Sequence, residues 1–164
     1  MPCRFGGLSV DGLDVNRPTA TSARRLTCVD APDDTTLIRV LICDDHPVVR
    51  KGLSALLSTA PDIEVIGTAA DGEEAIKMTL ESSPDIVLMG VSMPGMDGME
   101  ATRRLLAIRP DVRVVMLTSF SGHERIREAL RAGAVSYVLK DSRPEDVIKS
   151  IRSAARSAEL REDL

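Results

Sequence analysis

The sequence predicts a doubly wound α/β domain, in which helices cover both faces of a parallel sheet. From Leu37 onward, short apolar runs alternate five times with amphipathic segments, and two of the runs are apolar without interruption. Uninterrupted apolar strands are typical of parallel sheets that are buried on both faces. Strands that alternate with helices are joined by right-handed crossovers, which place helices on both sides of the sheet.

The predicted strands are short, and most are rich in β-branched side chains. They cover residues 38–43, 63–68, 85–89, 112–118 and 135–140. The continuously apolar stretches are 86–89 and 114–117, and we expect helices to cover both sides of these two strands.

Three of the intervening segments carry apolar side chains on one helical face, which predicts helices packed on the core. The positions are Val49, Leu53, Leu56 and Leu57; Ile126, Ala129, Leu130 and Gly133; and Val147, Ile151, Ala154 and Ala155. Pro47 suits the first turn of the first helix, because an amide hydrogen there would have no intrahelical partner. Ser-x-x-Glu patterns predict that Ser121 and Ser142 cap the two helices that follow them.

A chain of 164 residues has room for one domain of ordinary size. Residues 1–36 contain prolines, a Gly-Gly pair and scattered charges without periodicity, so they are predicted to form a flexible extension. The alternative, that an upstream start codon adds residues without a role, stays open. The predicted domain covers residues 37–158, and residues 159–164 form a charged tail or the start of a linker.

Composition excludes several classes of function. A net charge of −4 and an aromatic content of 2% disfavour a basic surface with stacking aromatics for nucleic acid. Cys3, Cys28 and Cys43 are odd in number and widely spaced, which favours a reducing cytoplasm over a disulfide framework or a metal cluster. No apolar run approaches the roughly 18 residues of a membrane span, and no signal-peptide stretch is present. A cytoplasmic location without membrane contact is predicted.

Polar side chains stand where three of the predicted strands end. Asp44 and Asp45 follow the first strand, Thr118 and Ser119 end the fourth, and Lys140 ends the fifth. In a doubly wound sheet these ends lie on one rim. Paired carboxylates favour a hard cation such as Mg²⁺, and a lysine can compensate their charge or bind a phosphoryl oxygen. The alternative reading of the aspartates, a solvated acidic turn that caps the first helix, stays open.

The stretch from residue 38 to 156 resembles the receiver domain of two-component response regulators. The matching motifs are VLICDDHPVVRKGL at 40–53, PDIVLM at 84–89, MPGMDGMEA at 93–101 and GAVSYVLKD at 133–141. The first is similar to the opening of the NarL/FixJ-like (LuxR-type) subfamily. The resemblance covers about 120 residues, a full domain, and implies a flavodoxin-like (CheY-like) (βα)5 fold with strand order 2-1-3-4-5.

The resemblance also implies roles for individual residues. Asp44, Asp45 and the backbone carbonyl of Ser92 would bind Mg²⁺, and Lys140 would contact the phosphoryl group. Thr118 and Tyr137 would be the switch residues that respond to phosphorylation, although Tyr137 reads equally well as a strand residue packed on the sheet. His46 matches the subfamily too, but it has no second His or Cys nearby and is interpreted as a loop-surface residue rather than a ligand.

The chain departs from the family at position 90. The family places its phosphoacceptor Asp directly after the third apolar run, where this sequence has Gly90. Glycine cannot form an acyl phosphate, but a strand end tolerates it. Mg²⁺ affinity is therefore expected to be weak, and the metal-free fold is expected to gain stability from reduced repulsion. Asp97 is no substitute, because it is predicted to start the next helix. Gly90 is either native, a deliberate substitution or a sequence error.

The resemblance implies a non-enzymatic signalling domain from a DNA-binding transcription regulator. Its implied partners are a sensor histidine kinase and a second copy in a homodimer, and DNA would bind only through a C-terminal domain absent from these 164 residues. The alternative is a stand-alone pseudo-receiver that binds a partner without phosphorylation. A small phosphatase or phosphotransferase using Asp44, Asp45 and Mg²⁺ is a third hypothesis, which the lack of a nucleophile at Gly90 disfavours.

Overall fold

The computed structural model describes residues 36–162, with side chains described as far as residue 157. The described part alternates strands and helices without exception. The strands are β1 (Ile38–Cys43), β2 (Ile63–Ala69), β3 (Ile86–Gly90), β4 (Arg113–Thr118) and β5 (Ser136–Leu139). The helices are α1 (Pro47–Leu57), α2 (Gly72–Ser82), α3 (Gly98–Ile108), α4 (His123–Arg131) and α5 (Pro144–Glu162). The predicted extension lies outside the described residues except for residue 36, and α5 continues past the predicted domain end at 158.

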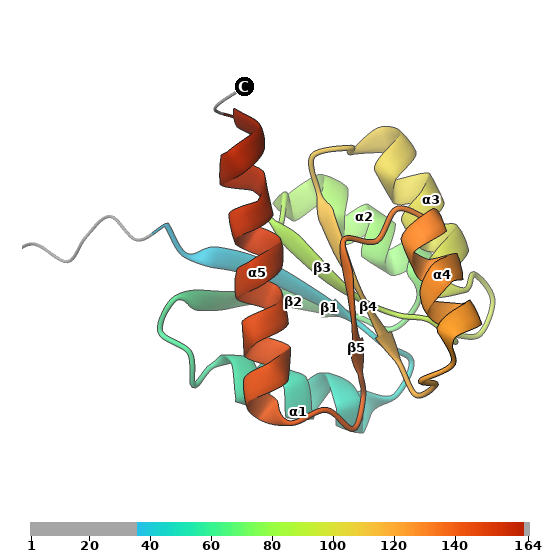
Figure 1. Ribbon diagram of the computed structural model, residues 1–164, viewed down its shortest axis with the longest axis horizontal. Coiled ribbons are helices and arrows are strands. Elements are labelled where there is room, and N and C mark those ends of the chain that lie inside the picture. The colour runs from blue at the N-terminus through green and yellow to red at the C-terminus, as the bar shows by residue number, and fades with distance from the viewer. Residues whose placement is uncertain (1–35, 163–164) are drawn as a thin grey trace, which may run out of the picture. The chain divides into compact units, whose positions relative to one another are not determined.

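The strands form one parallel sheet in the order β2-β1-β3-β4-β5, which confirms the predicted fold class and strand order. Helices α1 and α5 cover one face of this sheet, and α2, α3 and α4 cover the other (Figure 1). The side chains of β1 alternate between the two layers: Leu41 packs under α2 and α3, whereas Val40 and Ile42 pack under α1 and α5. No helix among residues 36–162 is long and apolar enough to cross a bilayer.

Two predictions about helix starts are wrong. Helix α4 has Gly122 at its N-cap without a side-chain hydrogen bond, so Ser121 does not cap it. In the first turn of α5 the amides of Asp146 and Val147 donate to the carbonyl of Arg143, which places Ser142 outside the helix. Proline at position 144 fits the first helical turn and fixes this later start. By contrast, Asp97 caps α3 as predicted, because its side chain accepts a hydrogen bond from the amide of Glu100.

Two predicted core positions are also wrong. Leu130 is 49% exposed and Gly133 is exposed beyond the end of α4, whereas Ala129 on this helix is buried in the core. Helix α4 spans only nine residues and lies beside the edge strand β5. The apolar face of α4 is wider than the part of the sheet that α4 covers. Leu130 therefore lies at the margin of this face, in contact with solvent.

Asp62, in the turn before β2, forms hydrogen bonds with both α5 and the start of β1. Its carboxylate accepts two hydrogen bonds of 2.7 Å from Arg152 of α5, and its carbonyl accepts one of 2.9 Å from the amide of Ile38. The hydrogen bonds from Arg152 lower the pKa of Asp62 below its usual range. A carboxyl whose pKa is lower in the folded state contributes stability above its unfolded pKa, and this contribution disappears as the pH falls through the folded value.

Replacing Asp62 by Asn is therefore expected to lower the free energy of unfolding at pH 7 by about 0.5–1 kcal/mol, because the pair is partly exposed. The difference from the unaltered chain should shrink as urea denaturation is repeated at increasingly acidic pH. Asp141→Asn provides the control, since Asp141 is exposed and forms no ion pair within the described residues. A D62N deficit that stays constant with pH would contradict this assignment.

Candidate functional site

The carboxyl ends of the three inner strands and of β5 meet at one edge of the sheet. Gly90, the last residue of β3, pairs with Leu117 of β4, and Thr118 pairs with Leu139 of β5. Two further hydrogen bonds continue this pairing past the strands: Val91 donates to the carbonyl of Leu117 over 2.9 Å, and Lys140 donates to that of Thr118 over 2.8 Å. The backbone therefore fixes the predicted rim before any side chain is considered.

Asp44 lies at the centre of the rim and is fully buried. Its Oδ2 atom is 2.5 Å from Nζ of Lys140, and its Oδ1 atom accepts a hydrogen bond of 2.9 Å from the amide of His46. Arg50 of α1 donates to the Asp44 carbonyl over 2.6 Å, a contact that the sequence analysis did not identify. A buried carboxylate without a cation is costly, and Lys140 is the cation that lies against Asp44 inside the fold.

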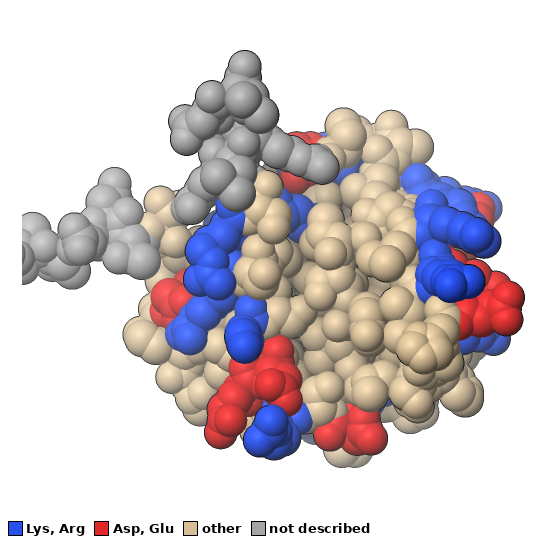
Figure 2. Space-filling view, in the orientation of Figure 1, with Lys and Arg blue, Asp and Glu red and all other residues tan. Residues whose placement is uncertain are grey.

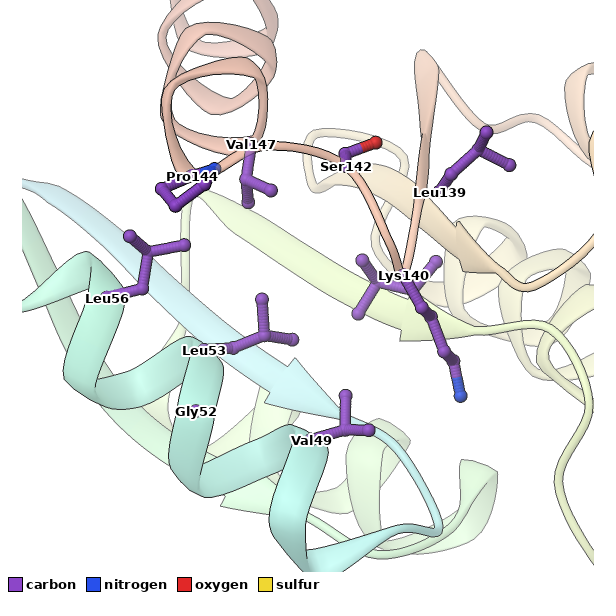
Figure 3. A pocket seen from close by; sticks show the side chains of 10 residues that line it. Val49, Gly52, Leu53, Leu56, Leu139, Lys140, Ser142, Pro144 and Val147 are labelled. Atoms are coloured by element: carbon purple, nitrogen blue, oxygen red, sulfur yellow. The ribbon is translucent and has the colours of Figure 1, made fainter.

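Lys140 reaches Asp44 from the loop between β5 and α5. Its aliphatic stem runs along an apolar cavity of about 220 Å³ between α1 and α5, towards the first turn of α1 (Figure 3). The cavity is lined by Val49, Gly52, Leu53, Leu56, Leu117, Leu139, Lys140, Ser142, Pro144 and Val147. The side chains that line this cavity are mostly apolar, and the ammonium group of Lys140 is paired with the carboxylate of Asp44.

Asp45 and His46 complete the acidic end of the rim. Nδ1 of His46 lies 2.8 Å from Oδ1 of Asp45 and 3.2 Å from Oδ1 of Asp44. One ligand atom from each of the three residues falls within 4.8 Å of the others. Within the described residues, Oδ1 of Asp45 and Oδ2 of Asp44 are buried without a hydrogen-bond partner, although Nδ1 of His46 lies near the first atom and Nζ of Lys140 near the second. Buried oxygens without donors fit a divalent cation, so these residues are suited to hold Mg²⁺.

Gly90 lies directly against Asp44. A Cβ atom added to Gly90 would be 2.9 Å from Oδ2 of Asp44 and 3.3 Å from the carbonyl of Cys43. The first turn of α3 also approaches the backbone of Gly90, because a Cβ atom added at Gly98 would clash with the Gly90 carbonyl oxygen. Gly90 is thus in contact with Asp44. Any side chain at position 90 would meet the Asp44 carboxylate, which also contacts Lys140.

The other predicted site residues differ in their surroundings. Thr118 is 5% exposed, and its hydroxyl accepts a hydrogen bond of 3.1 Å from the amide of Phe120. Ser92 is exposed in the loop after β3, and Tyr137 is 40% exposed on β5. Thr118 therefore belongs to the rim, while Tyr137 lies two residues before the partner of Thr118 in the register of β4 and β5.

Cys43 is not a reactive group of this site, although it immediately precedes Asp44. Its thiol donates to the carbonyl of Asp71 and lies 3.5 Å from the sulfur of Met93. Burial, together with the nearby carboxylates of Asp71 and Asp44, raises the pKa of the Cys43 thiol to about 12. The thiol thus stays protonated at neutral pH and neither attacks a substrate nor binds a metal.

Comparison with known proteins gives one consistent family. The profile described as "Response regulator receiver domain" matches residues 40–152. The transcriptional regulatory protein LiaR of Bacillus subtilis is 45% identical over 120 residues, which are 73% of this chain and 57% of LiaR. The response regulator protein VraR of Staphylococcus aureus is 44% identical over 119 residues, 73% of this chain and 57% of VraR. The chain thus spans about half the length of the curated relatives that it matches.

The solved structures that resemble this chain are also response regulators. A LuxR-family two-component response regulator from Aurantimonas superposes with a TM-score of 0.71 at 35% identity, covering 74% of this chain and 86% of the other. The receiver domain of the NarL response regulator of Mycobacterium tuberculosis gives a TM-score of 0.70 at 31% identity, over 73% and 97%. Together with the profile match, these similarities place the chain in the response regulator receiver domain family.

Proposed function

We propose that residues 37–158 are the signal-input domain of a longer LuxR-type transcription regulator, and that Gly90 occupies the phosphoacceptor position. The names of LiaR and VraR, the LuxR-family structural neighbour and the half-length match support the first part. The position of Gly90 at the end of β3, against Asp44, supports the second. With glycine there, no carboxylate is available to attack a phosphodonor, and the domain signals without phosphorylation at this position.

The remaining rim residues receive roles that follow from this assignment. Asp44, Asp45 and the backbone carbonyl of Ser92 bind Mg²⁺, with weak affinity because Gly90 contributes no anionic side chain. Lys140, which would contact a phosphoryl group, instead neutralises Asp44. Thr118 and Tyr137 are the switch residues. The exposure of Tyr137 leaves its ring room to change rotamer, which supports this role.

The proposed partners follow from the same assignment. A sensor histidine kinase would dock near the rim, a second copy would form a homodimer in the cytoplasm, and DNA would bind through a C-terminal domain outside this sequence. The domain itself would not act as an enzyme, since position 90 offers no carboxylate nucleophile.

Restoring the carboxylate, by Gly90→Asp, tests this function most directly. With acetyl phosphate and Mg²⁺, intact-mass analysis should detect one added phosphoryl group on G90D and none on the unaltered chain. Without Mg²⁺, G90D should lose about 1–3 kcal/mol of unfolding free energy, since its Cβ must displace the Asp44 carboxylate. G90N serves as the control of similar size without a nucleophile. Labelling of the unaltered chain, or of neither protein, would contradict the assignment of Gly90.

A second candidate function, a partner-binding pseudo-receiver, is favoured by the surface of α4 and β5. Leu130, Val135 and Tyr137 are all at least 40% exposed. Figure 2 shows that the surface between α5 and α4 is largely uncharged and bordered by charged side chains of both signs. If this fragment alone binds a protein partner equally well with Gly90 and with G90D, this function replaces the input-domain proposal. Loss of binding by Leu130→Asp would localise the interaction.

A further inference from the structure

We propose that the cavity between α1 and α5 binds a small uncharged molecule that has an aliphatic body and one oxygen able to accept a hydrogen bond (Figure 3). A medium-chain aliphatic ketone is the model for this class of ligand. The cavity lies beside the rim rather than within it, and the inference does not depend on the role assigned to Gly90.

The side chains around the cavity leave apolar surface uncovered. Val49, Leu53 and Leu56 belong to the face of α1 that packs on the core, yet all three are only half-buried. Figure 3 shows Val49, Leu53 and Val147 pointing into the space between the two helices. Voids larger than a water molecule are few in protein interiors, and apolar surface in contact with water is unfavourable. An apolar molecule that displaces water from this cavity of about 220 Å³ therefore gains free energy.

Gly52 keeps space free on the α1 side of the cavity. Glycine is among the least favourable residues inside a helix, and a helical glycine usually has a packing or functional reason. Close packing is not the reason here, because a Cβ atom added to Gly52 would have no neighbour within 4 Å. Gly52 lines the cavity, so a larger side chain at this position would take up space at its opening.

The polar groups of the cavity determine the charge of the ligand. They are the ammonium of Lys140 and the hydroxyl of Ser142, and none of the described residues that line the cavity is acidic, which disfavours a cationic ligand. The charge of Lys140 is already matched by Asp44, whose Oδ2 is 2.5 Å from Nζ. A ligand carboxylate would add a second anion beside Asp44, which is also unfavourable.

The chemistry of Lys140 determines the polar atom of the ligand. An ammonium group has three hydrogen-bond donors and no acceptor. An uncharged oxygen can therefore accept a hydrogen bond from Lys140 that Asp44 does not use. Because Lys140 also contacts Asp44, a molecule bound in the cavity would touch the rim without occupying it.

The volume and walls of the cavity determine the size of the ligand. An apolar cavity of roughly 150 Å³ binds benzene, so in proportion a cavity of 220 Å³ accommodates about nine non-hydrogen atoms. The described residues of the lining include no aromatic ring on which a flat ligand could stack. A flexible aliphatic chain fits better, and 2-octanone combines this size with a carbonyl near one end.

NMR titration of the full chain with 2-octanone tests the proposal. The methyl resonances of Leu53 and Val147 should shift in a saturable way, with a Kd of about 0.1–1 mM for a ligand of this size. Intermolecular NOEs should connect these methyl groups with the ketone chain. Heptanoate and octylammonium have the same number of non-hydrogen atoms, and each should bind about tenfold more weakly because a charge enters the apolar site.

Two variants that reduce the volume of the cavity locate the site. Gly52→Leu adds a side chain at the opening, and Leu53→Trp enlarges one that already points inwards. Each should lower the affinity for 2-octanone about tenfold or more, since the ligand and the added atoms compete for one space. The matched control is Ala55→Leu, because Ala55 is exposed on α1 outside the cavity, and it should bind the ketone like the parent.

The proposal is wrong if the shifts do not saturate, if G52L and L53W both bind the ketone like A55L, or if either charged probe binds as tightly as the ketone. Sedimentation tests another occupant: a parent chain that forms dimers, and loses them in G52L but not in A55L, would assign the cavity to a second copy. None of these readings involves acetyl phosphate. The G90D labelling result and the ketone result can therefore fail separately.

Discussion

Replacing Gly98 by alanine is expected to lower the free energy of unfolding by at least about 3 kcal/mol, the upper end of the usual cost of overpacking. The added methyl group would lie 1.9 Å from the carbonyl oxygen of Gly90 and 3.1 Å from the side chain of Met89. The first of these atoms belongs to the backbone of a buried strand and cannot rotate away. Either β3 or the start of α3 must therefore move.

The movement would also break a connection between the two elements. The amide of Gly98 donates to the carbonyl of Val91 over 2.9 Å and holds the first turn of α3 against the loop after β3. Urea denaturation measures the effect. Gly52→Ala is the control, since Gly52 lies within α1 and its Cβ position has no neighbour within 4 Å; this variant should gain up to about 1 kcal/mol. Equal stabilities of G98A and G52A would show that the approach of α3 to β3 is not tight.

Hydrophobic periodicity was sufficient to predict the fold class and the positions of the strands. The stretch 86–89 became the fully buried centre of β3, and the predicted strand at 112–118 begins only one residue later in the structure. These predictions succeeded because a strand covered on both faces must be apolar at every position, and such a run has few other interpretations. The order of the strands came instead from the resemblance of the motifs to a known family.

Helix starts were less predictable, for a local reason. A Ser-x-x-Glu pattern states which side chains could cap a helix, but the turn that precedes the helix decides where it begins. At α5 the start depends on Pro144, two residues after the expected cap at Ser142. At α4 it depends on a loop in which Gly122 takes an extended conformation. Neither loop conformation can be read from a capping pattern.

The rim was predictable at the level of the backbone, but its contacts were not. Strand ends in a parallel sheet converge whatever their side chains are, so Asp44, Thr118 and Lys140 were correctly expected on one edge. Which Asp44 oxygen accepts Lys140, and which contacts His46, depends on rotamers that packing selects. Arg50 was missed for the same reason: no sequence signal separates it from an ordinary surface arginine of α1.

Removing the ion pair between Lys140 and Asp44 is expected to cause a loss of stability comparable to that of Gly98→Ala. Lys140→Met is expected to lower the free energy of unfolding by about 3 kcal/mol, measured with divalent cations removed, because it leaves a buried carboxylate without its cation. Asp44 is completely buried, and the Lys140 side chain is only 16% exposed, so water cannot replace the lost charge. Methionine retains most of the aliphatic stem along the cavity of Figure 3, which keeps the loss of packing small.

A double variant separates the charge from the packing. Asp44→Asn combined with Lys140→Met removes both charges, so it should be more stable than K140M alone by at least about 1 kcal/mol, and D44N alone completes the double-mutant cycle that measures the coupling. Lys149→Met is the matched control, because Lys149 is exposed on α5, and it should change stability by about 0.5 kcal/mol or less. If K140M were as stable as K149M, Asp44 would not depend on Lys140. The rim would then tolerate an unpaired buried carboxylate, and Lys140 would be free for another anion.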